Sequence, residues 1–184
     1  MKMVSSQAPL AENGYYPSEE ENVMSVEKQA LVLPALNPEA VSARTSSAYP
    51  EPFKALVAGR CKQALGEALG LKNFGVNLVK LPPGAYSSLR HWHMQQDEFV
   101  YVLEGELILI TDTGEQTLKA GMVAGFPAGK PDGHHLVNRS QAVAVYLEVG
   151  DRLPGDSATY PDVDLAFEQS LGKPVFTHKD GSPY

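Results

Sequence analysis

The chain has 184 residues, with 15 lysines and arginines against 22 aspartates and glutamates, and a formal net charge of −7. This acidic balance argues against a nucleic-acid-binding surface, which needs clustered basic residues. The length fits one domain with appendages, and a hydrophobic content of 43% is enough for one core. No run of about 18 apolar residues is present, so no membrane-spanning segment is expected.

The N-terminal part of the chain is polar and acidic. Residues 1–28 include three glutamates in a row and lack the apolar core of a secretory signal peptide, so we expect a mobile arm. Cys61 is the only cysteine, which rules out an intrachain disulfide. Together these features predict a cytoplasmic protein. The proline-rich segment 29–52 is expected to form a strap that lies on the domain or on a partner subunit.

Residues 61–73 favour a short helix, although Gly66 and Gly70 weaken that interpretation. From Phe74 onward the pattern is typical of strands. "FGVNLVKL" predicts one strand, and residues 98–121 predict three more, with turns at 104–105 and 113–114. With shorter segments up to residue 150, about eight strands are expected, which indicates a β-sandwich or barrel. The core is expected to include Phe99 and Phe126, and one helical turn is expected around 163–169.

Four of the five histidines fall in two short segments. His91 and His93 stand two residues apart, so on a strand their side chains share a face. Asp97 and Glu98 follow, and a carboxylate oxygen with imidazole nitrogens is a ligand set for Zn, Mn, Fe, Ni or Cu. Either histidine of the 134–135 pair can supply a fourth ligand, leaving coordination positions open for water or substrate. The alternative is a histidine pair on a solvated strand.

Two spaced motifs carry a resemblance to a known family. The first reads Gly84, six residues, His91-x-His93, four residues, Glu98, six residues, Gly105. The second reads Gly121, five residues, Pro127-x-Gly129, four residues, His134, three residues, Asn138. In this order they resemble the two conserved motifs of the cupin superfamily, which have five residues after the first glycine and two before the second-motif histidine. Over roughly residues 48–184 the chain is similar to small bacterial single-domain cupins.

This resemblance implies an all-β fold, a double-stranded β-helix or jelly-roll barrel with short N- and C-terminal extensions. The expected parts are an N-terminal extension over 1–47, a cupin barrel over 48–150 and a tail over 151–184 that packs on the barrel. The resemblance also implies a homodimer. It implies one divalent metal ion (Zn, Mn, Fe or Ni) held by His91, His93, Glu98 and His134. The motif spacing selects Glu98 over Asp97 and His134 over His135, although the insertion at 132–133 can shift the second register by one residue.

The expected function is a metal-binding enzyme that acts on a small polar metabolite through isomerase or lyase chemistry, for example on a sugar or sugar phosphate. The alternatives are an iron-dependent dioxygenase, a non-catalytic small-molecule-binding cupin and a structural cupin with a vestigial site. No catalytic residue is identified. Glu148 is a candidate second carboxylate in the barrel, with a surface position as the alternative. Lys80 and Lys130 are candidates to meet an anionic substrate, but no clear basic cluster is evident in the barrel segment, which counts against phosphate binding.

Overall fold

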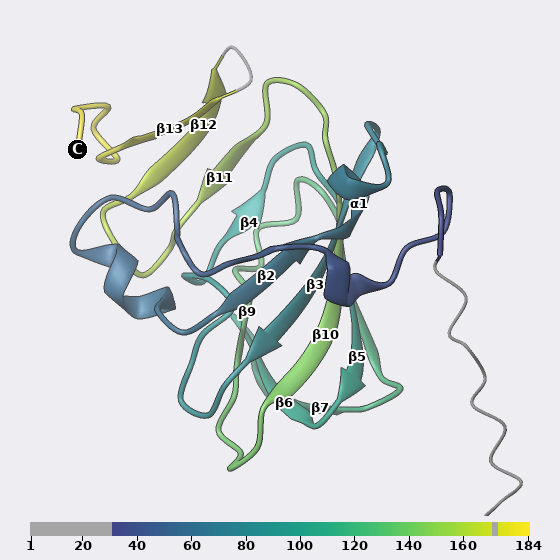
Figure 1. Ribbon diagram of the computed structural model, residues 1–184. Helices are drawn as coiled ribbons and strands as arrows, with labels where there is room; N and C mark the ends of the chain where they lie inside the picture. The colour runs from purple at the N-terminus through teal and green to yellow at the C-terminus, as the bar shows by residue number, and fades with distance from the viewer. Residues whose placement is uncertain (1–30, 171–172) are drawn as a thin grey trace, which may run out of the picture. The chain divides into compact units, whose positions relative to one another are not determined.

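The computed structural model describes residues 31–170 and 173–184 (Figure 1). The acidic arm expected over residues 1–28 lies outside the described residues, as does the beginning of the strap. The described part of the chain contains 13 strands, two 3-10 helices and one four-residue α-helix. The prediction of an all-β fold is therefore confirmed.

The strands form three antiparallel sheets. The six-stranded sheet has the order β1 (Ala43–Arg44), β2 (Cys61–Ala64), β3 (Phe74–Leu81), β10 (Ala144–Asp151), β5 (Glu98–Glu104), β8 (Val123–Phe126). The three-stranded sheet has the order β7 (Gly114–Lys119), β6 (Glu106–Thr111), β9 (His135–Val137). The four-stranded sheet has the order β13 (Lys173–Thr177), β12 (Ala166–Ser170), β11 (Ser157–Thr159), β4 (Trp92–His93). The helical elements are η2 (Pro38–Ala40), η3 (Phe53–Val57) and α1 (Leu65–Ala68).

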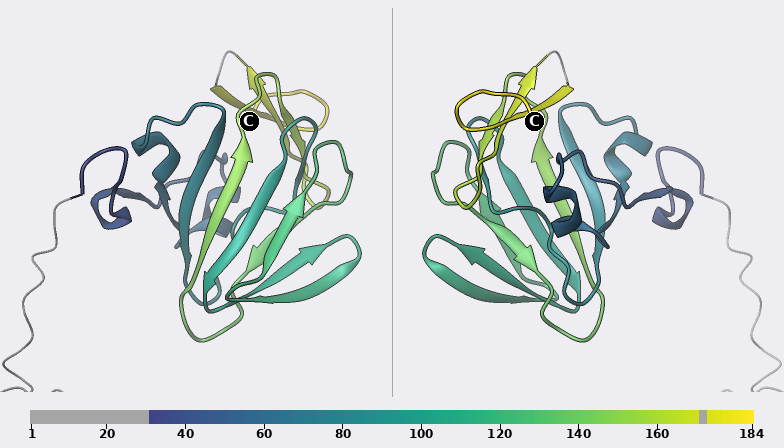
Figure 2. Two further views of the ribbon diagram at one scale, coloured as in Figure 1. Left: turned by 90° about the vertical axis from the view of Figure 1, so that its right-hand side faces the viewer. Right: turned by 90° about the vertical axis from the view of Figure 1, so that its left-hand side faces the viewer.

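The main core lies between the six-stranded and the three-stranded sheets, which face each other in Figure 2. Alternate residues of each strand point inward, because side chains change face at every residue of a strand. Val100 and Val102 of β5 are buried in this way, as are Leu107 and Leu109 of β6. The turn between these two strands is made by Gly105, which has a φ of 74° and lies so close to β10 that a Cβ would come within 3.2 Å of it.

A second hydrophobic cluster joins the segment before the barrel to the C-terminal tail. Tyr49 and Val57 pack with Ala158, Tyr160 and Leu165, together with Leu89 from the loop before β4. The Tyr49 ring lies 5.8 Å from the Tyr160 ring in an edge-on contact. Residues that the chain places more than a hundred positions apart therefore share one core. The boundaries 1–47, 48–150 and 151–184 stay a prediction.

Three local predictions are wrong. Residues 61–64 form strand β2 along β3, so α1 covers only 65–68, and Gly66 is packed so close to β3 that a Cβ would lie 2.8 Å from the nitrogen of Val76. Residues 166–170 form strand β12 rather than a helical turn, because they pair with both β11 and β13. Phe99, expected in the core, is 42% exposed on the outer face of β5. In each case pairing with distant strands overrides local sequence preference.

None of the helices in the described residues has the length and apolar character needed to span a bilayer.

Candidate metal centre

His91 and His134 are brought together by the backbone itself. The main-chain nitrogen of His91 donates to the carbonyl of His134 over 3.2 Å, and the nitrogen of His134 donates to the carbonyl of His91 over 2.9 Å. Two residues paired across strands in this way project their side chains to the same face. The pair therefore fixes the register of the second histidine segment, and His135, the next residue, packs against Tyr86 instead.

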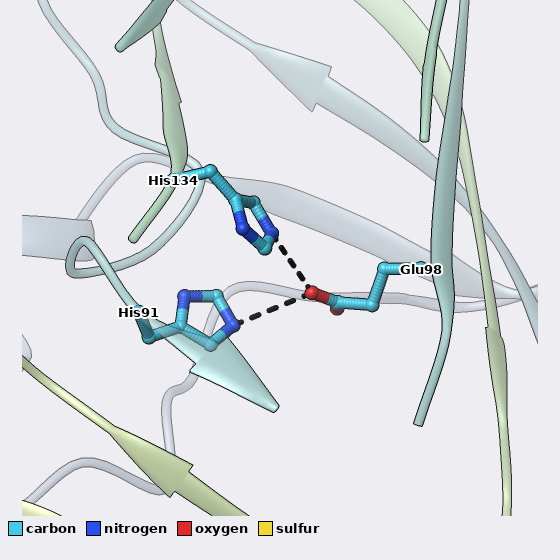
Figure 3. Close-up of side chains that lie close together, drawn as sticks. All are labelled: His91, Glu98 and His134. Carbon is cyan, nitrogen blue, oxygen red and sulfur yellow. Dashed lines mark hydrogen bonds and ion pairs between the residues drawn. The ribbon is translucent and has the colours of Figure 1, made fainter. Parts of the chain in front are cut away.

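Three imidazoles converge on one carboxylate oxygen, Oε2 of Glu98. The Nε2 atom of His134 lies 2.9 Å from this oxygen, that of His91 lies 3.6 Å away, and that of His93 lies 3.8 Å away. Figure 3 shows the His91 and His134 rings approaching Glu98 from the same side. Ligand atoms of His91, Glu98 and His134 all lie within 4.8 Å of one another, and His93 adjoins this group with its ring centroid 5.0 Å from that of His91.

The far nitrogens of two of these rings are tied to the surrounding protein. Nδ1 of His91 donates to the carbonyl of Leu89 over 2.9 Å, and Nδ1 of His93 lies 2.5 Å from Oδ2 of Asp156. Such bonds hold the proton on Nδ1 and leave the lone pair of Nε2 directed toward Glu98, as a metal-binding imidazole requires. Three nitrogen donors and one carboxylate oxygen in this orientation fit a divalent transition metal.

Burial and mutual contact keep this cluster ready to bind a cation. Burial lowers the pKa of His91 to about 4, so its imidazole is neutral at pH 7. Burial alone would raise the pKa of Glu98, but the hydrogen bond from His134 and the neighbouring imidazoles lower it to about 2. At pH 7 Glu98 is therefore charged and His91 is neutral, the protonation states in which these two groups coordinate metals.

The neighbouring sequence candidates lie elsewhere. Asp97 accepts a hydrogen bond from the main-chain nitrogen of Ala128 over 2.7 Å and is exposed. Nδ1 of His135 bonds the carbonyl of Ser88 over 3.2 Å, and its ring packs 5.5 Å from that of Tyr86. The structure thus groups Glu98 and His134 with the histidine pair, in place of their sequence neighbours. That these four side chains bind metal remains a prediction.

Three residues that support the cluster carry no recognisable signal in the sequence. Asp156, 1% exposed, holds His93 and also accepts the main-chain nitrogen of Gln95 over 3.0 Å. The Tyr160 ring stacks on His91 with centroids 5.7 Å apart, and the Phe126 ring stacks on His134 at 3.5 Å. Asp156 and Tyr160 come from the tail, where the spacing of the two motifs gives no information.

The cluster forms part of the wall of a cavity of about 290 Å³ inside the barrel. Glu148 also lines this cavity, so the interior alternative holds for this carboxylate. It accepts hydrogen bonds from Lys62 over 2.7 Å and from Asn77 over 3.1 Å. Arg60 and Lys62 both line the cavity, which overturns the expectation that the barrel has no basic cluster. Lys80 and Lys130, the sequence candidates for this role, are exposed and do not line it.

Comparison with known proteins places this arrangement in a family. Residues 77–150 match the model of a cupin domain. Among solved structures, the chain is 50% identical to a sugar phosphate isomerase from a cupin superfamily of Silicibacter pomeroyi DSS-3, with a TM-score of 0.80 over 82% of this chain and 96% of that one. It is 25% identical to a candidate sugar phosphate isomerase from Acidithiobacillus ferrooxidans, with a TM-score of 0.66 over 77% of this chain and 89% of that one.

A polyketide cyclase from Streptomyces resistomycificus shares 20% identity, with a TM-score of 0.54 over 64% of this chain and 78% of that one, which shows similarity of fold alone. A search of the curated proteins gives no match. The match to the cupin domain and the 50% identity over nearly all of the Silicibacter protein agree with the two motifs and with the three antiparallel sheets. The chain belongs to the cupin superfamily.

Proposed function

We propose that this protein is a metal-dependent isomerase of a small phosphorylated sugar. The observation that carries the proposal is the convergence of three imidazole nitrogens on one carboxylate oxygen inside a cavity that a second carboxylate, Glu148, also lines. The 50% identity to a sugar phosphate isomerase supports the choice of substrate class. A fold alone would not, because unrelated chemistries use the same barrel.

In this proposal His91, His93, Glu98 and His134 hold one divalent ion, with Zn, Mn, Fe and Ni all compatible with the ligand set. A bound ion of this kind supplies Lewis-acid polarisation of a carbonyl or hydroxyl oxygen of the substrate. The protein holds the ligands in place through the Leu89 carbonyl and the Asp156 carboxylate. The aromatic rings of Tyr160 and Phe126 pack against His91 and His134 and hold their orientation.

Glu148 is the residue that we assign to proton transfer. Interconversion of an aldose and a ketose removes a proton from a carbon next to a carbonyl and returns it to the neighbouring carbon, which one carboxylate can perform. Glu148 lies on β10 opposite Val100, two residues along β5 from Glu98, and both glutamates face the cavity. Its side chain is 23% exposed and is held by Lys62 and Asn77, so its carboxylate stays within the cavity.

The proposal includes a homodimer. Four large apolar side chains lie exposed on the outer face of β5 and β8, namely Phe99 (42%), Tyr101 (36%), Leu103 (37%) and Val123 (52%). Tyr101 and Val123 are paired across the two strands, so these residues form a continuous apolar patch. Such a patch commonly marks an interface. Light scattering of the wild type should give about twice the 19.9 kDa chain mass. The mass of a single chain at micromolar concentration would contradict the dimer, and an unchanged dimer mass for Tyr101→Glu would contradict this patch as its interface.

The function is tested with protein loaded separately with each of the four metals. Aldose and ketose phosphates are incubated with it in deuterium oxide, and interconversion and deuterium uptake at the carbon next to the carbonyl are followed by NMR. We expect turnover with at least one metal, and its loss in Glu148→Gln with metal content unchanged. Oxygen consumption by the iron-loaded protein would instead support a dioxygenase, and saturable binding without turnover would support a binding cupin.

A further inference from the structure

One arginine of this chain differs from the others. The chain has five arginines, all within the described residues. Four are paired with carboxylates: Arg44 and Arg152 with Glu67, Arg90 with Asp112 and Asp162, and Arg139 with Glu115. Arg60 forms no ion pair with any carboxylate of the described residues. Instead it lines the barrel cavity, where it donates a hydrogen bond to the main-chain carbonyl of Ser87.

Two basic side chains at the start of β2 face the cavity. Lys62 on β2 is paired with Val79, whose side chain is fully buried in the barrel core. Lys62 therefore projects to the inner face of the sheet. Arg60 lies directly before β2, and its side chain also lines the cavity. The charge of Lys62 is matched by Glu148 at 2.7 Å. The unmatched positive charge at this end of the cavity thus comes from Arg60.

A buried hydroxyl without a partner lies beside this charge. Tyr146, on β10, is 1% exposed, and its hydroxyl makes no hydrogen bond of normal geometry among the described residues, although the Ser87 side chain lies near it. Burial raises its pKa well above the usual value, and the positive charge of Arg60 opposes that rise, as it does for Tyr49. Both tyrosines line the cavity. A buried hydroxyl without a partner is costly, so an acceptor oxygen bound here would relieve that cost.

Two aromatic rings separate this basic end from the histidine cluster. The ring centroid of Tyr49 lies 5.8 Å from that of Tyr160, which lies 5.7 Å from that of His91. The positive charge of Arg60 acts to lower the pKa of Tyr49. The cavity is continuous along this wall, because the same 290 Å³ space is lined by Arg60, Tyr49, Tyr160 and His91. A ligand can therefore place an anionic group at Arg60 and still extend to the cluster.

We infer that Arg60, together with the Tyr146 hydroxyl, binds the phosphoryl group of the substrate, an assignment that rests on the proposed function. A guanidinium presents two parallel N–H donors that match two oxygens of a phosphoryl group or of a carboxylate. A phosphoryl group has a third oxygen, beyond the two that face the guanidinium, which can accept from Tyr146, whereas a carboxylate has only two oxygens. The remainder of the sugar then lies toward Glu148 and the histidines, so the phosphoryl group sets which carbon reaches the cluster.

The binding part of the test needs no turnover. Inorganic phosphate is titrated calorimetrically into the metal-loaded full chain, in the wild type, Arg60→Gln, Arg60→Lys and Tyr146→Phe, with acetate as a second probe. Loss of a charge-assisted pair should weaken phosphate binding about 10- to 100-fold in Arg60→Gln. The phosphate affinity of Arg60→Lys should be intermediate. This variant keeps the positive charge and a donor to Ser87, but it lacks the two parallel N–H donors of the guanidinium. Tyr146→Phe should weaken the binding of phosphate but leave the binding of acetate unchanged.

Arg139→Gln is the matched control, since it removes an arginine from a surface pair outside the cavity. Phosphate affinity that is absent in the wild type, equal in Arg60→Gln, or lowered as much by Arg139→Gln would overturn the assignment. If Arg60→Gln fails to fold, the lysine and phenylalanine variants decide by the same criteria.

Kinetics then separate this inference from the proposed function. If the wild type isomerises a sugar phosphate, Arg60→Gln should raise KM about tenfold or more for the phosphorylated sugar and leave KM for the unphosphorylated sugar unchanged. An equal effect on both sugars would overturn the phosphoryl assignment while the isomerase remains. Phosphate binding that depends on Arg60, in a protein that isomerises nothing, would leave the anion site standing and reject the isomerase.

Discussion

The cavity has two walls of different origin. One wall is built by the two histidine motifs, whose ligand candidates follow from strand alternation and from the direct backbone pairing of His91 with His134. The other wall is built by Arg60, directly before β2, and by Tyr160, from the tail, while Asp156 of the tail holds His93 from outside the cavity lining. The first wall supplies the atoms that face a metal, and the second holds them and adds charge. The difference teaches that a motif identifies the donors, while their orientation depends on segments outside the motif.

The largest effect should come from the motif wall itself. His134→Ala removes an Nε2 atom 2.9 Å from Glu98, whereas His135→Ala removes a ring that packs on Tyr86. We expect His134→Ala to lose more metal affinity than the roughly 100-fold that loss of a supporting residue costs. His135→Ala should retain about one metal per chain by elemental analysis. The opposite result, metal kept in His134→Ala and lost in His135→Ala, would show that the register assigned to this segment is wrong.

Acid should lower the stability of the metal-free protein, because two groups of the motif wall have lowered pKa values in the folded chain. The pKa of His91 is about 4 in the folded chain against an ordinary value of 6.5, so the unfolded chain binds a proton that the folded chain does not. The free energy of unfolding should therefore fall as pH drops from about 6.5 to about 4, by on the order of 3 kcal/mol. Glu98, whose pKa is lowered to about 2 from 4.5, adds a further loss between about pH 4.5 and 2.

Urea unfolding of chelator-treated protein between pH 7 and pH 4.5 measures how the free energy of unfolding changes with pH. His91→Gln should make the free energy of unfolding less dependent on pH, and His178→Gln, which changes a histidine of the tail that does not line the cavity, serves as the control. A free energy of unfolding that stays constant over this range in the wild type would contradict the assignment.

Much of the motif wall could be predicted from the sequence, and little of the second wall could. Residues 98–121 carry apolar, partly β-branched runs between turns at glycines, so β5, β6 and β7 were expected where they occur. The spacing of the motifs also selected Glu98 and His134, which the structure groups. The tail was misread, because residues 166–170 form a strand only through their pairing with β11 and β13.

Arg60 was missed for a similar reason. The lysines singled out from the sequence, Lys80 and Lys130, are exposed, whereas Arg60 directly precedes a segment, 61–73, that was interpreted as a helix. The pairing of β2 with β3 turns Lys62 inward, and the chain entering this strand brings Arg60 to the same cavity. The charge of the cavity could therefore not be predicted from the sequence without the register of this strand.

The second wall can be tested through Asp156. Asp156→Asn keeps the size of the side chain and an oxygen for the main-chain nitrogen of Gln95, but it loses the carboxylate that holds Nδ1 of His93 at 2.5 Å. Metal affinity should fall about 10- to 100-fold, because a partner of this kind fixes the orientation of the ligating ring. Competition with a fluorescent chelator measures the change. Asp164→Asn, a carboxylate in the exposed tail, is the control, and equal affinities for the two variants would reject an orienting role for Asp156.

The smallest effect should come from the hydroxyl of Tyr160, which separates ring packing from hydrogen bonding in the second wall. Tyr160→Phe keeps the ring that stacks on His91 at 5.7 Å and removes only the hydroxyl. Metal affinity should stay within about threefold of the wild type, because the stacked ring is unchanged. Tyr160→Leu, which also loses the stacked ring, should weaken metal binding more than Tyr160→Phe does. If Tyr160→Phe instead weakens metal binding as much as Asp156→Asn does, the second wall acts on the histidines through polar contacts and not through packing.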